Sequence, residues 1–269
     1  MAQQIIGFIG AGNMAESLVG GMIAKGIRPA RIWMNDVSAD RLDLLNQQHR
    51  VHVSTRSSDV AERADVLVLA VKPQVMAEVC AALRESLGDR RPLIISIAAG
   101  ITVARLREWL GDLPVVRTMP NTPALVQAGA TGLFAGPGVS EDQRELAGQI
   151  MASVGLTFWF EQESELDVVT AVSGSGPAYF FLMMESMIDA GVKMGLDTRT
   201  ARQLVLQTAW GAAQLAITSE HPPARLREQV TSPGGTTAAA LGVFEQTGFR
   251  DNVTQALMAA RDRADELAK

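Results

Sequence analysis

The sequence has few of the residues that form disulfides, bind metals or attract nucleic acid. Its single cysteine, Cys80, excludes an intrachain disulfide, and its three histidines show no recognisable metal-ligand spacing. The formal net charge is −5 and no run of Lys or Arg occurs, so the chain lacks the basic patch that attracts nucleic acid or an anionic membrane. These absences predict no metal, a small-molecule partner and a reducing cytoplasm.

Long apolar runs are also missing from the sequence. Val66 to Val71, for example, is far shorter than the ~20 residues that span a bilayer, so we expect no membrane segment. The first apolar run, Ile5 to Ile9, follows neither a basic leader nor a small-residue cleavage site, and it predicts a strand rather than a signal peptide. With 47% apolar and 20% charged residues, the composition is that of a globular protein.

The N-terminal part alternates short β-branched runs with helix-period stretches. This rhythm is typical of a parallel sheet with helices on both faces. The strands that it predicts are Ile5 to Ile9, Arg31 to Met34, Val51 to Val53, Val66 to Val71, Leu93 to Ile97 and Val115 to Met119. Two further strands, Ala130 to Ala135 and Leu156 to Phe160, flank a helical segment and should extend the same sheet. The expected α/β domain is a doubly wound sheet over residues 1–162.

Beyond Glu163 the strand signal stops and the pattern becomes all-α. The expected helices are Leu166 to Val172, Tyr179 to Met194, Thr198 to Thr218, Ala224 to Val230, Thr236 to Gln246 and Asp251 to Ala268. Several are apolar most of the way round, and such helices must be buried. Roughly 100 residues offer little interior for that surface. We therefore expect residues 163–269 to form a helical dimerisation domain; the alternative is that these side chains pack only within one subunit.

The first predicted strand runs into a glycine-rich turn and then a helix. Gly10 permits the tight turn, Gly12 lets the backbone approach a pyrophosphate, and Ala15 is small enough for close helix-to-strand packing. The N–H groups at the helix start would receive the negative charge. At the beginning of a βαβ unit, this pattern predicts a Rossmann-like domain that binds NADPH or NADH.

The end of the second strand bears on the choice between these cofactors. Asp36 lies where an acidic side chain would bond the adenosine ribose hydroxyls, which favours NADH. Binding of a 2′-phosphate, and hence of NADPH, is not excluded, because other polar side chains could approach the same ribose. They are Asn35, Ser38, Arg41 and either Ser57 or Ser58. Asp36 is equally compatible with a helix N-cap region without a ligand.

Other strand ends should line the same groove, because ligands bind beyond the carboxyl ends of parallel strands. Lys72 is predicted to contact ribose or phosphate, with plain solvation as the alternative. The proline-flanked turn at Asn121 should lie near the nicotinamide. The predicted cofactor-binding residues are Ile9, Gly10, Ala11, Gly12, Asn13, Met14, Asn35, Asp36, Ser57, Ala70, Val71, Lys72, Pro73, Ala98, Ala99 and Asn121.

Two later motifs make the pattern specific. They are Ala171 to Tyr179 (AVSGSGPAY) and Thr231 to Thr237 (TSPGGTT). Together with the cofactor turn, the AVKP and AAG segments and the NTP turn, in this order, they closely resemble the pyrroline-5-carboxylate reductase family. The resemblance covers nearly the whole chain. It implies reduction of 1-pyrroline-5-carboxylate to L-proline, the last step of proline biosynthesis, in a dimer with interlocking helical domains, with decamers of five dimers in some members.

The resemblance also implies site residues. The carboxylate of a small cyclic imine needs clustered donors, and the loop Ser232 to Thr237 offers glycines and helix-start N–H groups for it. Thr237 matches the threonine whose hydroxyl bonds the ring nitrogen, so it is the expected catalytic residue. Glu163 matches a position near the substrate; a helix-dipole role is the alternative. The predicted substrate-binding residues are Glu163, Ser173, Ser175, Ser232, Gly234, Gly235, Thr236 and Thr237.

The segment Ser173 to Pro177 is expected to end one helix and begin the next, close to the nicotinamide, with a plain helix-to-helix turn as the alternative. Two rival functions remain at this point. A β-hydroxyacid dehydrogenase would need a catalytic lysine on the long helix, but Lys193 lies late in it and the Ser-Pro-Gly-Gly loop would go unexplained. A nucleotide sensor without turnover would have no need of both glycine-rich loops.

Overall fold

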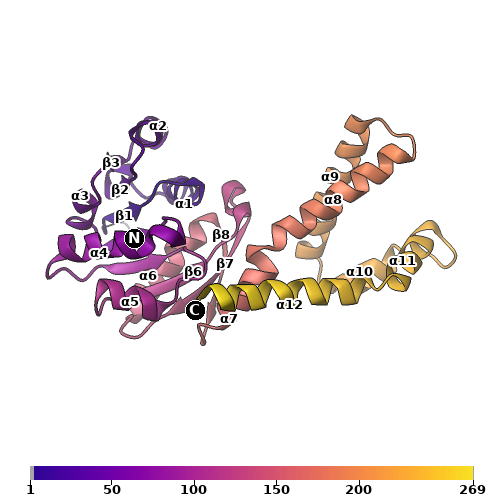
Figure 1. Cartoon of the computed structure of the whole chain (residues 1–269). Helices are drawn as coiled ribbons and strands as arrows, with labels where there is room; N and C mark the ends of the chain where they lie inside the picture. The colour runs from indigo at the N-terminus through magenta and orange to yellow at the C-terminus, as the bar shows by residue number, and fades with distance from the viewer. Residues whose placement is uncertain (1–2, 269) are drawn as a thin grey trace. The chain divides into compact units, whose positions relative to one another are not determined.

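The computed structural model describes residues 3–268 and contains two compact units (Figure 1). The sheet unit comprises the chain up to Ser175 together with the residues from Ala260 onward, and the helical unit runs from Gly176 to Ala259. Each unit is described by itself.

The sheet unit is built on eight hydrogen-bonded strands in the order β3-β2-β1-β4-β5-β6-β7-β8. Their bounds are Ile6–Ile9 (β1), Ile32–Asn35 (β2), His52–Ser54 (β3), Val66–Leu69 (β4), Leu93–Ser96 (β5), Val115–Met119 (β6), Gly129–Ala135 (β7) and Gly155–Phe160 (β8). All eight predicted strands occur, and the two late ones extend the same sheet as expected. The Rossmann-like fold is confirmed.

One strand direction was not foreseen. β7 pairs antiparallel with β6, whereas every other neighbouring pair is parallel. The connection between β6 and β7 holds only the short 3₁₀ helix η3 (Thr122–Val126). A parallel crossover needs a dozen or more residues, so this link can only turn the chain back.

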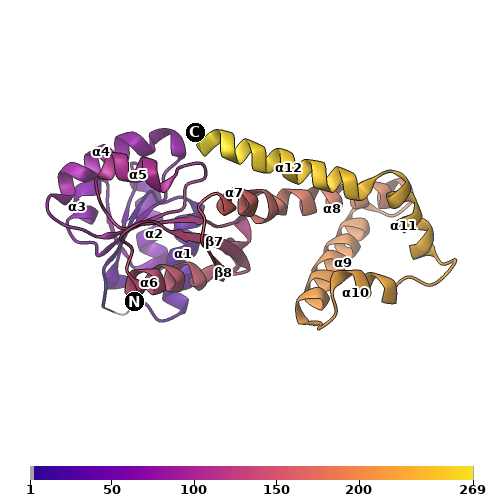
Figure 2. The same cartoon turned by 90° about the horizontal axis from the view of Figure 1, so that it is seen from below.

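Helices cover both faces of the sheet, because the side chains of each strand alternate between two cores (Figure 2). Ile6 and Phe8 of β1 face the core that is closed by α1, α2 and α6, whereas Ile9 faces the core under α3, α4 and α5. The bounds of the helical elements between β1 and β8 are Asn13–Ala24 (α1), Pro29–Arg31 (η1), Ala39–His49 (α2), Ser57–Ala61 (α3), Pro73–Val75 (η2), Met76–Leu87 (α4), Val103–Leu110 (α5), Glu141–Met151 (α6) and Ala152–Val154 (η4).

The boundary between the two compact units lies after Ser175, whereas the sequence predicted a domain limit at 162/163. After β8 the chain forms α7 (Glu165–Val169) and the π-helix η5 (Thr170–Gly174), which belong to the sheet unit. Leu166 and Ala171 are buried there, which explains why this segment stays with the sheet. The last residues of α12 (Phe249–Ala268) return to the same unit, where Leu267 approaches Gly100.

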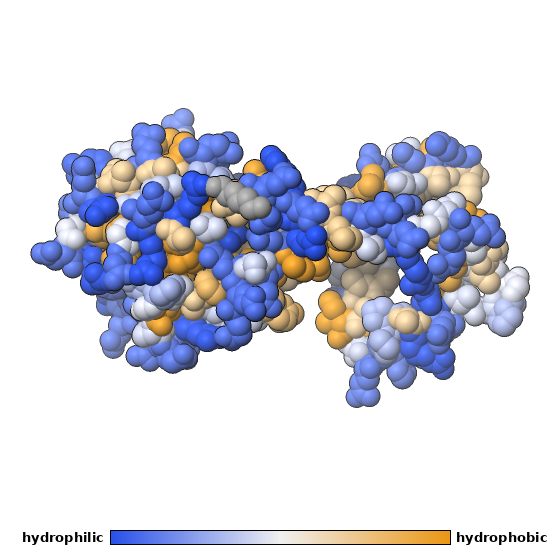
Figure 3. All heavy atoms as spheres, turned by 60° about the horizontal axis from the view of Figure 1, so that its bottom comes forward, coloured by the Kyte–Doolittle hydropathy of each residue, from blue (hydrophilic) through white to orange (hydrophobic). Residues whose placement is uncertain are grey.

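The helical unit contains α8 (Gly176–Lys193), α9 (Thr198–Thr218), α10 (Pro223–Gln229), α11 (Thr236–Gln246) and the first part of α12. α8 and α9 pack closely where Gly191 faces Ala201. Many large apolar side chains remain on its surface, among hydrophilic ones (Figure 3). Phe180, Phe181 and Trp210 are each at least 60% exposed. The single subunit therefore does not bury the apolar helical faces that the sequence contains.

The expectation that no segment is long and apolar enough for a bilayer is wrong. The helical stretch Glu165–Lys193 contains an 18-residue segment with a mean hydropathy of 1.2, which is long and apolar enough to cross a bilayer by length and composition, and 22% of that segment is buried. The expectation was based on unbroken apolar runs. In this stretch Ser, Gly and Thr separate the apolar residues, but the mean hydropathy stays apolar. A soluble protein's apolar helix meets the same test.

Candidate functional site

The glycine-rich turn between β1 and α1 has the backbone that the pattern predicted. Gly10 adopts a φ of +97°, and a Cβ built on it would lie 2.6 Å from the carbonyl oxygen of Ala70. Its N–H donates to the Asn35 carbonyl at 2.9 Å. Only glycine fits this position, because the chain must turn in the left-handed region while touching the end of β4.

Gly12 has the opposite surroundings. It is the N-cap of α1, and a Cβ built on it meets nothing within 4 Å. Because the cap has no side chain, no capping oxygen occupies the N–H groups of the first helical turn. Backbone donors, the positive end of the helix dipole and room for close approach are what a pyrophosphate requires, so the residues present fit the cofactor.

A network behind the turn engages the predicted ribose residue. Asp36 accepts from the N–H of Ala11 (Oδ2, 2.9 Å) and from that of Ser38 (Oδ1, 3.0 Å). Arg41 donates through Nε to the Ala11 carbonyl at 2.9 Å and through Nη2 to Glu16 at 2.5 Å. Asp36 and Arg41 therefore hold the cofactor turn itself from either side of Ala11, a role that sequence reasoning missed.

The remaining predicted cofactor residues lie at the carboxyl ends of the strands. Asn35 is buried and donates through its amide to the Ser54 carbonyl at 3.0 Å, so its side chain braces β3. Ser57 begins α3, and Lys72 is the exposed N-cap of η2. Ala70, Val71 and Pro73 adjoin Lys72, and Ala98 and Ala99 follow β5.

Asn121 joins two elements that the sequence left separate. Its amide donates to the carbonyl of Ser173 in η5 at 3.1 Å, and its Oδ1 accepts from the N–H of Ala130 at 2.9 Å. The side chain is 9% exposed. The predicted cofactor residue thus ties the β6–β7 turn to the π-helix.

At Ser173 to Pro177 one helical element ends and the next begins, as expected: the π-helix η5 ends at Gly174 and α8 begins at Gly176. Only Ser175 separates them, and its N–H donates to the Thr170 carbonyl at 2.8 Å. A π turn accommodates one more residue than an α turn, and here it leads from α7 to α8 without an intervening loop. Such bulges occur frequently at functional sites. Ser173 and Ser175 are both half-buried here.

The Ser232–Thr237 loop repeats the design of the cofactor turn within the helical unit. Gly234 adopts a φ of +71°, and Gly235 is the N-cap of α11, without a side-chain cap. Ser232, Gly234 and Thr236 are exposed, whereas Gly235 and Thr237 are half-buried. Because no side chain caps this helix start, its first N–H groups can serve as donors for a small carboxylate, and the Thr237 hydroxyl lies in the first turn.

Glu163 lies in a charged cluster inside the sheet unit. Its Oε1 accepts from the N–H of Val103 at 2.8 Å and from Arg117 Nη1 at 3.0 Å. Arg117, whose side chain is 5% exposed, also pairs with Asp167 at 3.5 Å. Burial raises the pKa of Asp167 despite the Arg117 charge that opposes this shift. Sequence reasoning missed both partners of Glu163, although an arginine inside an otherwise apolar strand was a signal for Arg117.

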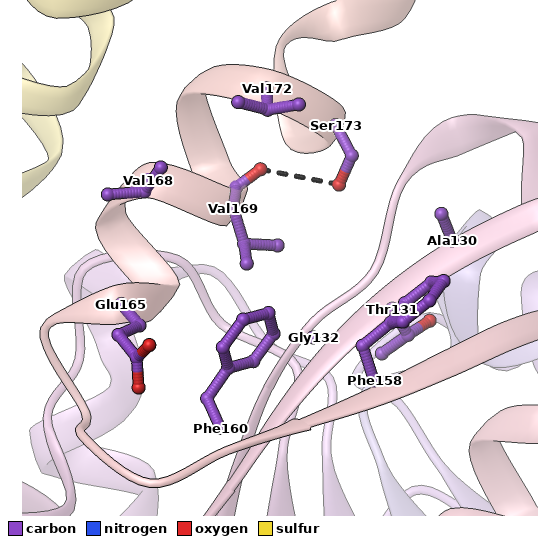
Figure 4. A pocket seen from close by; sticks show the side chains of 10 residues that line it. All are labelled: Ala130, Thr131, Gly132, Phe158, Phe160, Glu165, Val168, Val169, Val172 and Ser173. Carbon is purple, nitrogen blue, oxygen red and sulfur yellow. Dashed lines mark hydrogen bonds between the residues drawn. The ribbon is translucent and has the colours of Figure 1, made fainter. Parts of the chain in front are cut away.

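A separate apolar pocket of about 380 Å³ lies beside the sheet edge (Figure 4). Phe158 and Phe160 of β8 face Val168, Val169 and Val172 of the neighbouring helical segment across it. Its wall contains few polar groups, so it does not resemble a dinucleotide site. Among residues 3–268, no group of three or more His, Cys, Asp or Glu is placed to hold a metal ion.

Two family models match different parts of the chain. Residues 163–267 match the model described as pyrroline-5-carboxylate reductase dimerisation. Residues 5–100 match the model described as NADP oxidoreductase, coenzyme F420-dependent. The first covers the helical unit and its connections, and the second covers the cofactor turn and strands β1 to β5.

Full-length relatives and solved structures agree with these matches. The pyrroline-5-carboxylate reductase of Pseudomonas aeruginosa is 52% identical, with 100% of this chain and 98% of the relative covered. That of Haemophilus influenzae is 43% identical over 99% and 98%. The structure of a pyrroline-5-carboxylate reductase from Coxiella burnetii is 45% identical, with a TM-score of 0.93 over 99% of both chains. A Plasmodium falciparum pyrroline carboxylate reductase with NADP bound is 30% identical, with a TM-score of 0.88 over 100% of both chains.

Proposed function

Because this chain belongs to the pyrroline-5-carboxylate reductase family, we propose that it reduces 1-pyrroline-5-carboxylate to L-proline with NADPH or NADH. The reaction adds a hydride to the imine carbon and a proton to the ring nitrogen, and it is the last step of proline biosynthesis. The observation that carries the proposal is the pair of glycine-capped helix starts, at Gly12 and at Gly235. They match the two anionic groups of the reactants, the pyrophosphate and the carboxylate.

The nicotinamide, when bound, supplies the hydride, and the protein has to bind and orient. The turn from Ile9 to Met14 would hold the pyrophosphate, with the strand-end residues from Asn35 to Asn121 along the groove. The loop from Ser232 to Thr236 would hold the substrate carboxylate through backbone N–H groups. The Thr237 hydroxyl would bond the ring nitrogen and stabilise the amine as it forms, while the proton comes from solvent.

The other proposed substrate residues, Ser173, Ser175 and Glu163, belong to the sheet unit. Ser173 lies on the π-helix and Ser175 is its C-cap residue, and the widened turn gives the backbone a free approach. Glu163 matches the family position near the substrate, and one of its oxygens is already bonded within the sheet unit. Arg41 and Asp36, which brace the cofactor turn, are also the charged groups that a 2′-phosphate would meet.

The proposed assembly is a homodimer through the helical domain, with domain limits of 1–162 and 163–269. The match to a dimerisation model over residues 163–267 supports both. The helical unit has exposed apolar side chains, which we propose are covered by a second copy of the chain rather than by lipid. Further assembly into decamers of five dimers follows only from the family resemblance. The single buried Cys80 fits work in a reducing cytoplasm.

The test is loss of absorbance at 340 nm with purified protein and pyrroline-5-carboxylate, using NADPH and NADH in parallel. We expect rapid oxidation that falls about a hundredfold in Thr237→Ala, the usual effect of removing one donor from a developing charge. Thr254→Ala is the matched control, because Thr254 is an exposed threonine that bonds only its own helix. Cofactor binding without oxidation of either dinucleotide would contradict the proposal and favour a nucleotide sensor.

A further inference from the structure

Arg117 and Asp167 are buried charged residues of the sheet unit to which the proposed reaction assigns no role. Arg117 lies in the middle of β6, with Ser96 of β5 as its neighbour in register. Its guanidinium has two carboxylates beside it, Glu163 at 3.0 Å and Asp167 at 3.5 Å. A buried arginine is costly unless its hydrogen bonds are well placed, so the arrangement fixes the positions of both acids.

Glu163 carries this constraint to the start of α5. Its Oε1 is shared between Arg117 and the N–H of Val103, the first residue of that helix. The contact spans 60 residues of sequence and satisfies one of the N–H groups that a helix start leaves without a partner. Thr102 caps the same helix through its own side chain, which accepts from Arg105.

The segment held in this way is the loop between β5 and α5, which contains the predicted cofactor residues Ala98 and Ala99. It is also held from a second side. Gly100 has a φ of +74°, and a Cβ built there would lie 3.2 Å from both Cβ and the carbonyl oxygen of Leu267, near the end of α12. The loop is thus braced by Glu163 at one end and covered by the C-terminal helix at its glycine.

We propose that Arg117 is a positioning residue for the cofactor: acting through Glu163 and Val103, it fixes the β5–α5 loop, which contains the predicted cofactor residues Ala98 and Ala99. This rests on the proposed function. It gives Glu163 a structural task that is independent of any contact with substrate. Loosening the loop should weaken dinucleotide binding and misplace the hydride donor, and a displacement of about 1 Å at a reacting centre costs up to about a hundredfold in rate.

The experiment measures the Kd for NADPH by the fluorescence of the bound nucleotide, together with kcat and the KM for pyrroline-5-carboxylate, in full-length variants. Arg117→Met removes the brace, and Arg117→Lys restores one donor. Val103→Pro removes the N–H that Glu163 accepts, and the backbone tolerates it because proline suits the first position of a helix and Thr102 is already extended, with a ψ of 158°. Val103 is also a buried core residue, so Val103→Ala, which truncates the side chain but keeps the N–H, is the control for this variant. Neither Arg117 nor Val103 is proposed to touch substrate.

We expect Arg117→Met and Val103→Pro to raise the Kd for NADPH about tenfold and to lower kcat, with a smaller change in the KM for the imine and partial recovery in Arg117→Lys. Ile150→Ala is the matched control, since it opens a cavity under α6, on the other face of the sheet. Its Tm should fall while its Kd stays that of the wild type.

A lowered Tm with unchanged Kd and kcat in Arg117→Lys and Val103→Pro would overturn the proposal and leave the cluster a merely stabilising one. If Arg117→Met does not fold, Val103→Pro decides the question. The binding measurement needs no turnover. A wild-type protein that binds NADPH without reducing the imine would therefore contradict the proposed function and still test this inference.

Discussion

At the residue scale, Gly10 and Gly12 of one turn are required for different reasons. Gly10 is enclosed by the Ala70 carbonyl and needs a positive φ, so its lack of a side chain serves the fold. Gly12 faces open space with an ordinary negative φ of −69°, so its lack of a side chain leaves room for a ligand. Glycine thus has a structural role at position 10 and a binding role at position 12.

This difference predicts opposite outcomes for two alanine variants. Gly12→Ala should fold with a loss of about 1 kcal/mol or less, because alanine is a poorer N-cap, while its Kd for NADPH rises at least tenfold. Gly10→Ala should lose about 2 kcal/mol or more, since the new Cβ meets backbone in a strained conformation. Urea unfolding and nucleotide titration measure both quantities. Tight NADPH binding by Gly12→Ala would show that the pyrophosphate does not lie there.

At the scale of elements, the β6–β7 turn and the π-helix η5 are joined by a single side chain. Asn121 donates to Ser173 and accepts from Ala130, and it is almost fully buried. The two bonds hold together segments that are separated by 52 residues in the sequence. A change that disrupts the β6–β7 turn is therefore expected to disrupt the π-helix η5 as well.

Asn121→Ala should accordingly cost about 2 kcal/mol in the free energy of unfolding, because a buried donor and a buried acceptor both lose their partner. The midpoint of urea unfolding measures this loss. Asn252→Ala is the control: Asn252 is exposed and makes one long bond of 3.4 Å, so its loss should stay within about 0.5 kcal/mol. Equal midpoints for the two variants would mean that the turn and η5 hold without Asn121.

At the scale of the whole molecule, the helical unit has too little interior for its own apolar side chains. Its helices bury few residues, of which Gly191, Ala201 and Val205 lie on α8 and α9, while phenylalanines, leucines and methionines stay exposed. Large exposed apolar patches mark interaction surfaces in soluble proteins. A second subunit is the cover that fits a region matching a dimerisation model.

Light scattering after size exclusion should therefore give a mass of at least twice the 28.7 kDa of one chain. Phe181→Asp should shift the protein toward monomer and lower its stability, because it places a charge where an apolar cover is expected. Val37→Asp is the control, since Val37 is 95% exposed in the sheet unit, and its mass should not change. A monomeric wild type at micromolar concentration would contradict the proposed assembly.

The sequence by itself determined the strands, the two glycine turns and the apolar helices. These features depend on local preferences. β-branched runs form buried strands, only glycine tolerates the backbone conformation at position 10, and the apolar face of a helix must be buried against another surface. The ordered motifs from Gly10 to Thr237 also indicated the family, because each motif is recognised from its residues without knowledge of its neighbours in space. No contact across the chain was needed for any of these predictions.

Only the tertiary structure decided which side chains meet. That Asp36 and Arg41 brace the cofactor turn and that Glu163 holds the start of α5 depends on hydrogen bonds between residues 25 to 60 positions apart. The bond from Asn121 to Ser173, which joins the β6–β7 turn to η5, likewise depends on packing. Local propensity fixes an element's type, but charge pairing follows from which surfaces fold against one another, and a residue pattern does not specify that.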